Sequence, residues 1–203
     1  GSLAVLKCLA EASATIAEGE VRQMMTANNT ATVESDYLAV IEAKTAALFA
    51  AACRIGALVA ERPAAEEEAL ARFGRALGIA YQLTDDALDY AAGRNSQGRG
   101  ELGKNLGDDF RDGKLTLPVL LAFARGDAGE RGFWRRVLED QEQHDGDFDQ
   151  ALAILARHGT IKETVERAQA EGAEARRALA RFPDSPARRA LFDLVDYAVE
   201  RAR

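Results

Sequence analysis

The sequence predicts an all-α fold, and three observations lead to that prediction. Apolar residues recur at the 3.6-residue spacing of amphipathic helices along most of the chain. No stretch alternates apolar and polar residues as a half-buried β-strand would. Only four prolines interrupt 203 residues, which leaves room for long helices. Because the length and the 47% hydrophobic content are ordinary for one globular unit, we expect a single helical domain over residues 1–203.

Capping and turn residues place the starts of several helices. Ser35 or Asp36 precedes the second expected helix, Pro63 precedes the third, and Pro186 occupies a first-turn position in the last. Gly19 lies inside the first helix, where a glycine is typical of close approach by another helix or a ligand. The final third is rich in Arg, Glu and Ala and is expected to be scaffold. In chain order, the expected helices cover residues 4–26, 36–61, 64–92, 115–125, 129–141, 147–157, 161–181 and 185–201.

Charge and composition exclude several classes of protein. A formal net charge of −7 argues against a nucleic-acid-binding surface, because phosphate backbones select basic proteins. The longest apolar run, residues 46–53, is far shorter than the roughly 20 residues that span a bilayer, so no transmembrane segment is expected. Cys8 and Cys53 lack a CxxC spacing and are expected to be reduced thiols in a cytoplasmic protein. Gly1-Ser2 is typical of a cloning scar and the first helix starts without a cap, so we expect a natural amino-terminal part to be missing.

The most informative feature is an acidic seam on the third expected helix. Asp85, Asp86 and Asp89 fall, with Gln82, within a stripe roughly 100° wide on a helix whose other faces are mostly apolar. Residues 76–93 contain no Lys or Arg, so these carboxylates have no local cation. Clustered, partly desolvated carboxylates either take up protons or bind a hard cation, and Mg²⁺ usually arrives with substrate phosphates. The alternative is a solvated acidic patch or a set of helix caps.

A lysine in an apolar helix gives a second candidate. Lys44 is the only charged residue between Glu42 and Arg54, and it is followed by Thr45. Its ammonium either extends along the helix to reach water or points into an internal polar cavity as an anion donor. The unpaired acidic seam on the next helix favours the second alternative, because buried carboxylates need cations or a shared polyanionic ligand.

The stretch at residues 93–113 is rich in glycine and charge and is expected to be a mobile active-site loop. Its glycines and Lys104 match the skeleton of a P-loop, but a helix precedes it and Asn105 replaces the required Ser or Thr. We therefore exclude a P-loop and expect Lys104 and Lys114, with three nearby aspartates, to fold over a phosphate-metal cluster. The alternative is a solvated charged loop.

The two histidines do not indicate a catalytic or metal site. His144 and His158 lie on the charged late helices without a metal-ligand spacing, and we interpret them as surface residues. The sequence contains no arrangement typical of a Ser-His-Asp triad, a Cys-His pair or a zinc site.

Four motifs, taken in order, closely resemble the trans-type polyprenyl diphosphate synthases, in particular the long-chain bacterial enzymes that make quinone side chains. Together they extend over about 100 residues, and four motifs in the family's order are far more specific than any one of them. The motifs are GEVRQ at residues 19–23, KTAALF at 44–49, YQLTDDALDY at 81–90 and GKNLGDDFRDGKLTLP at 103–118.

The resemblance implies an all-α, isoprenoid-synthase-type helical bundle, usually homodimeric, of which this chain would be the carboxy-terminal portion. The implied activity is the Mg²⁺-dependent condensation of isopentenyl diphosphate with an allylic diphosphate. Asp85, Asp86 and Asp89 match a metal-binding motif of that family. Residues that match positions contacting the allylic diphosphate or its metals are Lys44, Thr45, Gln82, Lys104 and Lys114.

The chain departs from the family in one respect. The family's first aspartate-rich motif, the arginines after it and the isopentenyl diphosphate site do not occur in this sequence. We therefore expect the 203-residue chain to be inactive by itself. A noncatalytic helical subunit or scaffold of a heteromeric synthase is an alternative, although a scaffold has no physical reason to keep costly unpaired charges. A terpene cyclase of the same fold is a third possibility, which the GK…GK loop disfavours.

Overall fold

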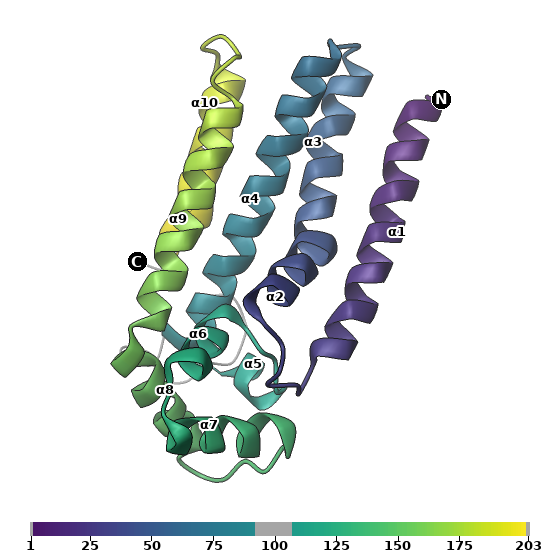
Figure 1. Cartoon of the computed structure of the whole chain (residues 1–203). Coiled ribbons are helices and arrows are strands. Elements are labelled where there is room, and N and C mark those ends of the chain that lie inside the picture. Colours follow the sequence, from purple (N-terminus) through teal and green to yellow (C-terminus); the bar gives the residue numbers. More distant parts are fainter. Residues whose placement is uncertain (1, 92–106, 202–203) are drawn as a thin grey trace.

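The computed structural model describes residues 2–91 and 107–201, which form helices joined by turns and loops and contain no β-strand (Figure 1). The all-α prediction is therefore confirmed. Two elements, η1 and η3, are π-helical turns. The elements are α1 (Leu3–Thr26), α2 (Glu34–Ile41), η1 (Glu42–Ala46), α3 (Ala47–Val59), α4 (Ala64–Ala91), α5 (Asp108–Arg111), α6 (Leu117–Arg125), α7 (Ala128–Trp134), η3 (Arg135–Glu139), α8 (Asp147–His158), α9 (Thr160–Ala178) and α10 (Pro186–Glu200).

Helix α4 is the centre of the bundle. The long helices α1, α3, α4, α9 and α10 run side by side, and the shorter helices α5 to α8 gather at one end (Figure 1). Helix α4 packs against α3 on one side and α9 on the other, while α1 packs against α3 and η1. Because α4 contacts both sides, its side chains can reach the space between several other helices.

Apolar side chains on α4 hold this helix at the centre of the bundle. Phe73 and Leu77 are buried in one cluster with residues of α9 and α10, and Leu83 is buried in another with residues of α2, α6 and α9. A glycine permits the close approach of η1, since a Cβ on Gly78 would lie 2.7 Å from the Cα of Ala46. Near the carboxyl-terminal end of α4, Gln82 contacts Thr45 of η1 and Asp86 contacts Tyr37 of α2.

A separate apolar cluster anchors the shorter helices to the end of α4. It joins Tyr90 of α4 to Phe110 of α5, Trp134 of α7 and Leu155 of α8. Burial of a side chain such as Phe110 contributes roughly 1.5–3 kcal/mol of stability. The cluster therefore holds the segment after residue 107 against the end of α4, although that segment has little regular structure of its own.

Most helix ends predicted from the sequence agree with the structure to within three residues. Three predictions about the helices were wrong. The N-cap of α2 is Val33, so Ser35 and Asp36 lie inside the first turn of that helix rather than before it. The first helix does have a cap, because the Ser2 hydroxyl accepts a hydrogen bond from the backbone amide of Val5 at 3.4 Å. Helix α5 lies within the stretch expected to be irregular. The rest of the expected loop, residues 93–106, lies outside the described residues, as does Lys104.

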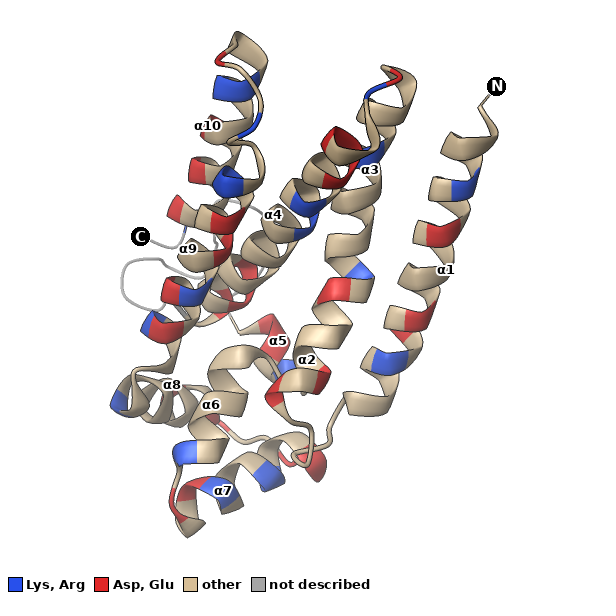
Figure 2. Ribbon diagram, turned by 45° about the horizontal axis from the view of Figure 1, so that its top comes forward, with Lys and Arg blue, Asp and Glu red and all other residues tan. Residues whose placement is uncertain are grey.

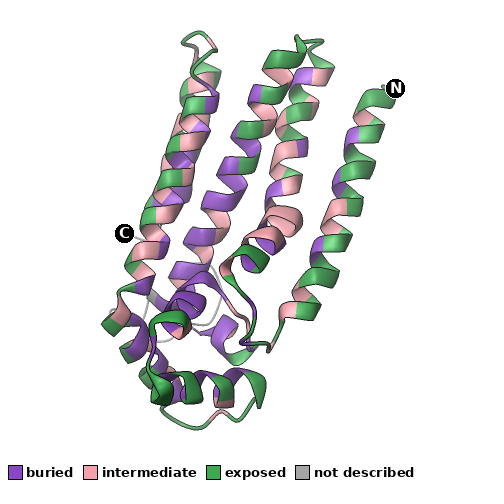
Figure 3. Ribbon diagram, viewed as in Figure 1, coloured by how far each residue is buried: buried purple, intermediate pink, exposed green. Residues whose placement is uncertain are grey.

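The surface of the described residues carries charges of both signs and an apolar strip along α1. Acidic and basic residues follow one another along α1 and α9 (Figure 2). The outer side of α1 is exposed (Figure 3) and includes Leu6, Met24 and Met25, each more than half exposed. Among the described helices, none has a stretch long and apolar enough to cross a lipid bilayer. Both cysteines are free thiols.

Candidate functional site

A cavity of about 260 Å³ opens between α1, α2, η1, α4 and the segment that contains α5. We call it the site cavity. Part of its wall is apolar, but the side chains that meet there from separate elements include two cations and three carboxylates. These are Lys44 and Thr45 of η1, Gln82, Asp85 and Asp86 of α4, and Asp109 and Lys114 from the α5 segment.

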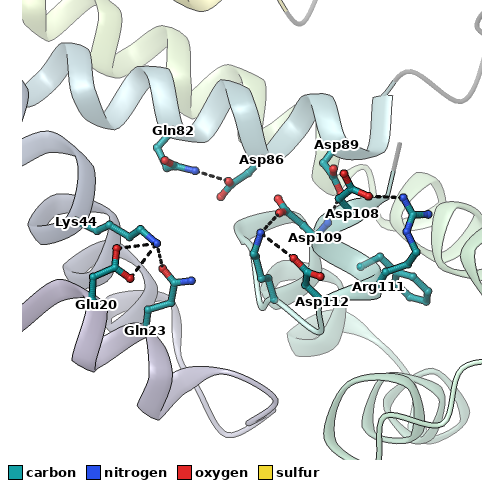
Figure 4. A network of polar contacts seen from close by, with 12 residues as sticks. Glu20, Gln23, Lys44, Gln82, Asp86, Asp89, Asp108, Asp109, Arg111 and Asp112 are labelled. Atoms are coloured by element: carbon teal, nitrogen blue, oxygen red, sulfur yellow. Dashed lines mark hydrogen bonds and ion pairs between the residues drawn. The ribbon is translucent and has the colours of Figure 1, made fainter. Parts of the chain in front are cut away.

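Lys44 lies on the π-helical turn η1, and its side chain lines the site cavity. Helix α1 lies so close to this turn that a Cβ on Gly19 would come 2.8 Å from the backbone nitrogen of Lys44. The close approach predicted from this glycine is therefore confirmed. The Lys44 ammonium donates hydrogen bonds to Glu20 at 3.1 Å and to Gln23 at 2.9 Å (Figure 4). Its ammonium thus lines the cavity, but its recorded partners lie on α1 rather than on the acidic seam.

The carboxylate of Asp86 is held by neutral donors from two sides. The Tyr37 hydroxyl donates to its Oδ2 at 2.5 Å, and the Gln82 side-chain amide donates to its Oδ1 at 2.8 Å. Thr45 donates in turn to the Gln82 oxygen at 3.0 Å. The pKa of Asp86 is raised to about 7, mainly by burial and to a smaller extent by the charges of Asp109 and Asp85, which together outweigh the lowering effect of these hydrogen bonds.

The other two aspartates of the seam occupy different places. Asp85 is half-buried and lines the site cavity. Asp89 is buried just outside the cavity lining, and its Oδ2 accepts a hydrogen bond from the backbone amide of Asp109 at 3.1 Å. With Asp86 and Asp89 only 3% and 6% exposed, the alternative of a solvated acidic patch fails for both.

Lys114 supplies the second cation. Its ammonium lies 2.6 Å from Asp109 and 3.4 Å from Asp112. Partial burial lowers the pKa of Lys114, but the hydrogen bonds and charges of these two aspartates outweigh that effect, so the net pKa is raised. Lys114 therefore stays charged at neutral pH, at the edge of the site cavity.

The structure brings together most of the site residues predicted from the sequence. Among them, Asp89 lies beside the cavity, and the position of Lys104 is not described. Sequence reasoning missed Tyr37, which lies two helical turns before Lys44 and is separated from Asp86 by 49 residues. The local signal was weak: a tyrosine, whose hydroxyl can donate a hydrogen bond, at the start of the apolar run over residues 37–41. The predicted residues that line the cavity are Lys44, Thr45, Gln82, Asp85, Asp86 and Lys114.

The donor set of the cavity fits a metal that arrives with phosphate. Within residues 2–91 and 107–201, no three His, Cys, Asp or Glu side chains are close enough together to hold a metal ion unaided. Asp85 and Asp86 nevertheless offer carboxylate oxygens beside Lys44 and Lys114, and hard divalent cations prefer such oxygens, often completed by phosphate oxygens. The described residues therefore fit a metal-diphosphate complex better than a bare ion.

His158 is not the surface residue that the sequence predicted. Its Nε2 lies 2.8 Å from Glu130, and its side chain is only 18% exposed. Glu130 also accepts a hydrogen bond from Arg157 and caps the start of α7 with Asp127. His144 is exposed, as expected. The His158 cluster therefore ties α7 to α8 and is remote in the fold from the site cavity.

Comparisons with known proteins agree with the helical fold. A family model described as polyprenyl synthetase matches residues 1–155. The octaprenyl diphosphate synthase of Escherichia coli is 41% identical over 205 residues, which cover 100% of this chain and 61% of that protein. The crystal structure of a decaprenyl diphosphate synthase from Rhodobacter capsulatus matches with a TM-score of 0.92 and 49% identity, covering 100% of this chain and 61% of that one.

A polyprenyl synthase from Caulobacter crescentus, crystallised with calcium and isoprenyl diphosphate, matches with a TM-score of 0.91 and 45% identity. That match covers 100% of this chain and 60% of the Caulobacter chain. The chain thus has the helical fold of these synthases and spans about three fifths of their length.

Proposed function

The chain belongs to the polyprenyl synthetase family, and on that premise we propose that it carries one wall of a prenyltransferase active site. The reaction proposed for the whole protein is the condensation of isopentenyl diphosphate with an allylic diphosphate to give a trans-polyprenyl diphosphate. Relatives with 40% and 41% identity are octaprenyl diphosphate synthases, which supports this class of reaction.

One observation carries the proposal at the level of residues. Lys44 and Lys114 line the same cavity as Asp85, Asp86 and Asp109. A cavity for a bare anion would need only the cations, and a cavity for a bare metal ion would need only the carboxylates. Their juxtaposition fits a ligand that carries both signs of charge, namely a diphosphate with its bound divalent cation.

The individual roles follow from the geometry and the resemblance. Lys44, Thr45, Gln82 and Lys114 are proposed to bind the diphosphate of the allylic substrate, and the resemblance adds Lys104 to them. Asp85 and Asp86 are proposed to hold Mg²⁺, which supplies positive charge that stabilises the departing diphosphate. The resemblance also implies that Asp89 binds the metal. The contact between Asp89 and the backbone of Asp109 instead supports a role in holding α5 in place.

In the proposed reaction, the protein stabilises the charge of the leaving diphosphate and excludes water from the site cavity. In the proposed reaction, the allylic C–O bond breaks and its electron pair leaves with the diphosphate. The double bond of isopentenyl diphosphate then attacks the allylic cation, and loss of a proton completes the new chain. Lys44 and Lys114 would donate hydrogen bonds to the leaving diphosphate. The apolar wall at Val40, Ile41 and Leu115 would keep water from the cation.

We further propose Mg²⁺ as the metal, a homodimer as the assembly and the cytoplasm as the setting. Oxygen donors and a diphosphate ligand favour Mg²⁺, although the Caulobacter relative was crystallised with calcium. The exposed apolar side of α1, which includes Leu6, Met24 and Met25, supports burial against another protein surface. Two free cysteines support a reducing compartment.

Thermal melting of the chain tests the proposed site. Mg²⁺ with pyrophosphate, at a concentration 100 times the dissociation constant, should stabilise the fold by about 2.7 kcal/mol through mass action. For a protein of this size, that gain raises the melting temperature by roughly 5–10 °C. Mg²⁺ with sulfate at matched ionic strength is the control. A noncatalytic scaffold would show no difference between pyrophosphate and sulfate, and that result would contradict the proposal.

A further inference from the structure

The contact between Tyr37 and Asp86 joins two elements inside the site cavity. Tyr37 lies on α2 and Asp86 on α4, and the hydrogen bond between them is 2.5 Å long. The Gln82 amide donates to the other oxygen of the same carboxylate (Figure 4). Each oxygen of Asp86 therefore accepts a hydrogen bond from a different side chain, which fixes the plane of the carboxylate. Without such donors, the terminal torsion of an aspartate is broad.

Both donors are themselves held in place. The Tyr37 ring packs in the apolar cluster that includes Ile41, Leu83 and Leu117. The Gln82 amide is oriented by the hydroxyl of Thr45, which donates to its oxygen at 3.0 Å. The carboxylate of Asp86 is thus clamped by groups that have little freedom of their own, and one of them, Tyr37, belongs to none of the motifs that carry the family resemblance.

We propose that Tyr37 is a positioning residue that fixes the Asp86 carboxylate for a divalent cation bound with diphosphate. The proposal rests on the proposed function of the site cavity. Side chains that hold a metal-binding carboxylate in this way typically contribute 10- to 100-fold to metal affinity. Tyr37 would act on the metal through Asp86 and would not itself contact the diphosphate.

The two lysines allow this role to be separated from a general effect on the fold. Lys44 is held by Glu20 and Gln23, and Lys114 by Asp109 and Asp112. Tyr37 is not a partner of either ammonium. Loss of the Tyr37 hydroxyl should therefore weaken the metal-dependent part of pyrophosphate binding and leave the metal-free binding to the lysines unchanged.

Isothermal titration of pyrophosphate into the 203-residue chain, with saturating Mg²⁺ and with EDTA, tests the proposal. Tyr37→Phe keeps the ring and removes only the hydroxyl. We expect it to lower affinity about tenfold with Mg²⁺ and less than twofold with EDTA. Tyr90→Phe is the matched control, because it removes another buried tyrosine hydroxyl that is not an Asp86 donor. An unchanged affinity with Mg²⁺, or an equal loss in both conditions, would overturn the proposal.

A double-mutant cycle with Asp86→Asn gives an independent check. If Tyr37 acts through Asp86, then Tyr37→Phe should cause no further loss of metal-dependent affinity in the Asp86→Asn background. Additive losses, or an Asp86→Asn variant that binds as tightly as the original chain, would overturn the proposal. Failure of the original chain to bind pyrophosphate with Mg²⁺ is a different result, because it would remove the proposed function itself.

Discussion

The backbone amide of Asp109 donates a hydrogen bond to the buried carboxylate of Asp89 at 3.1 Å. A second bond, from the amide of Gly107 to the Asp89 carbonyl at 3.1 Å, lies beside it. The end of α4 is thereby joined to the segment that carries Asp109 and Lys114 into the site cavity. One of the aspartates expected to bind metal thus has a contact that organises the cavity wall.

This contact predicts different results for two substitutions of Asp89. Asp89→Asn keeps an oxygen that can accept from the Asp109 amide, and we expect pyrophosphate affinity with Mg²⁺ to stay within about threefold of the original. Asp89→Leu removes the acceptor and leaves the buried amide unpaired, so we expect a loss of about tenfold or more. Titration calorimetry of both variants makes the comparison. An equal, large loss in both would instead assign Asp89 to the metal.

Removal of the Lys114 ammonium should weaken pyrophosphate binding whether or not Mg²⁺ is present. In Lys114→Met, the site cavity loses one of its two described cations, and Asp109 loses its ion-pair partner at 2.6 Å. We expect an affinity loss of about 10- to 100-fold, since a charge-assisted hydrogen bond contributes roughly 1.5–3 kcal/mol. Lys162→Met is the matched control, because Lys162 is 84% exposed on α9. Equal affinities of the two variants would contradict the assignment of Lys114.

Substitution of Gly19 should separate α1 from η1. The Cβ of Gly19→Ala would meet the Lys44 backbone nitrogen at 2.8 Å, a distance that forces the helices apart. We expect destabilisation of up to about 2 kcal/mol, since overpacking of about 1–3 kcal/mol exceeds the gain in helix propensity. Gly56→Ala is the control, because no atom outside its own stretch of helix lies within 4 Å of its Cβ position, and it should stabilise the fold by up to about 1 kcal/mol. Urea unfolding of both variants measures the difference, and a Gly19→Ala variant as stable as Gly56→Ala would refute the close contact.

The free energy of unfolding should depend on pH through Asp147 of α8, which pairs with Arg136 of η3. Two hydrogen bonds from Arg136, both 2.8 Å, and one from the His144 amide hold the pKa of Asp147 well below its usual range. A carboxyl whose folded-state pKa is lowered adds stability above its unfolded pKa of about 3.9, and the contribution is lost as pH falls through the folded-state pKa.

Asp147→Asn should therefore be less stable than the original chain at pH 7, by about 1.5–3 kcal/mol. The difference in free energy of unfolding between the two proteins should decrease steadily as the pH falls from about 5 toward 2, because protonation of Asp147 removes the same stabilisation from the original chain. Urea unfolding at a series of pH values measures this trend. The exposed Asp145→Asn should show no such gap. A gap that stays constant to pH 2 would rule out the pairing as its cause.

Local sequence patterns predicted the long helices and several of the residues that line the site cavity. Lys44 was recognisable because it is a single charge in an alanine-rich helix, and the acidic seam because its spacing matches a helical stripe. Gly19 revealed a close helix contact for the same local reason. Each of these signals lies within a few turns of one helix, where sequence spacing translates directly into position.

The remaining features depend on contacts between distant parts of the chain. Tyr37 meets Asp86 across 49 residues, and helix α5 is held by Asp89 and an apolar cluster that no local pattern encodes. The π-helical turn η1 was also missed, because a shift of hydrogen-bond register leaves no signature in an alanine-rich segment. Lys44 was expected to offset the acidic seam, whereas its recorded partners are Glu20 and Gln23.

A crystal structure with Mn²⁺ and pyrophosphate would test the central claim most directly, because manganese prefers the same oxygen ligands as magnesium and has an anomalous signal. We predict an anomalous peak at roughly 2.0–2.3 Å from a carboxylate oxygen of Asp85 or Asp86. The pyrophosphate should lie within hydrogen-bonding distance of both Lys44 and Lys114. A cavity that remains free of metal and pyrophosphate, or a metal bound away from both aspartates, would contradict the account.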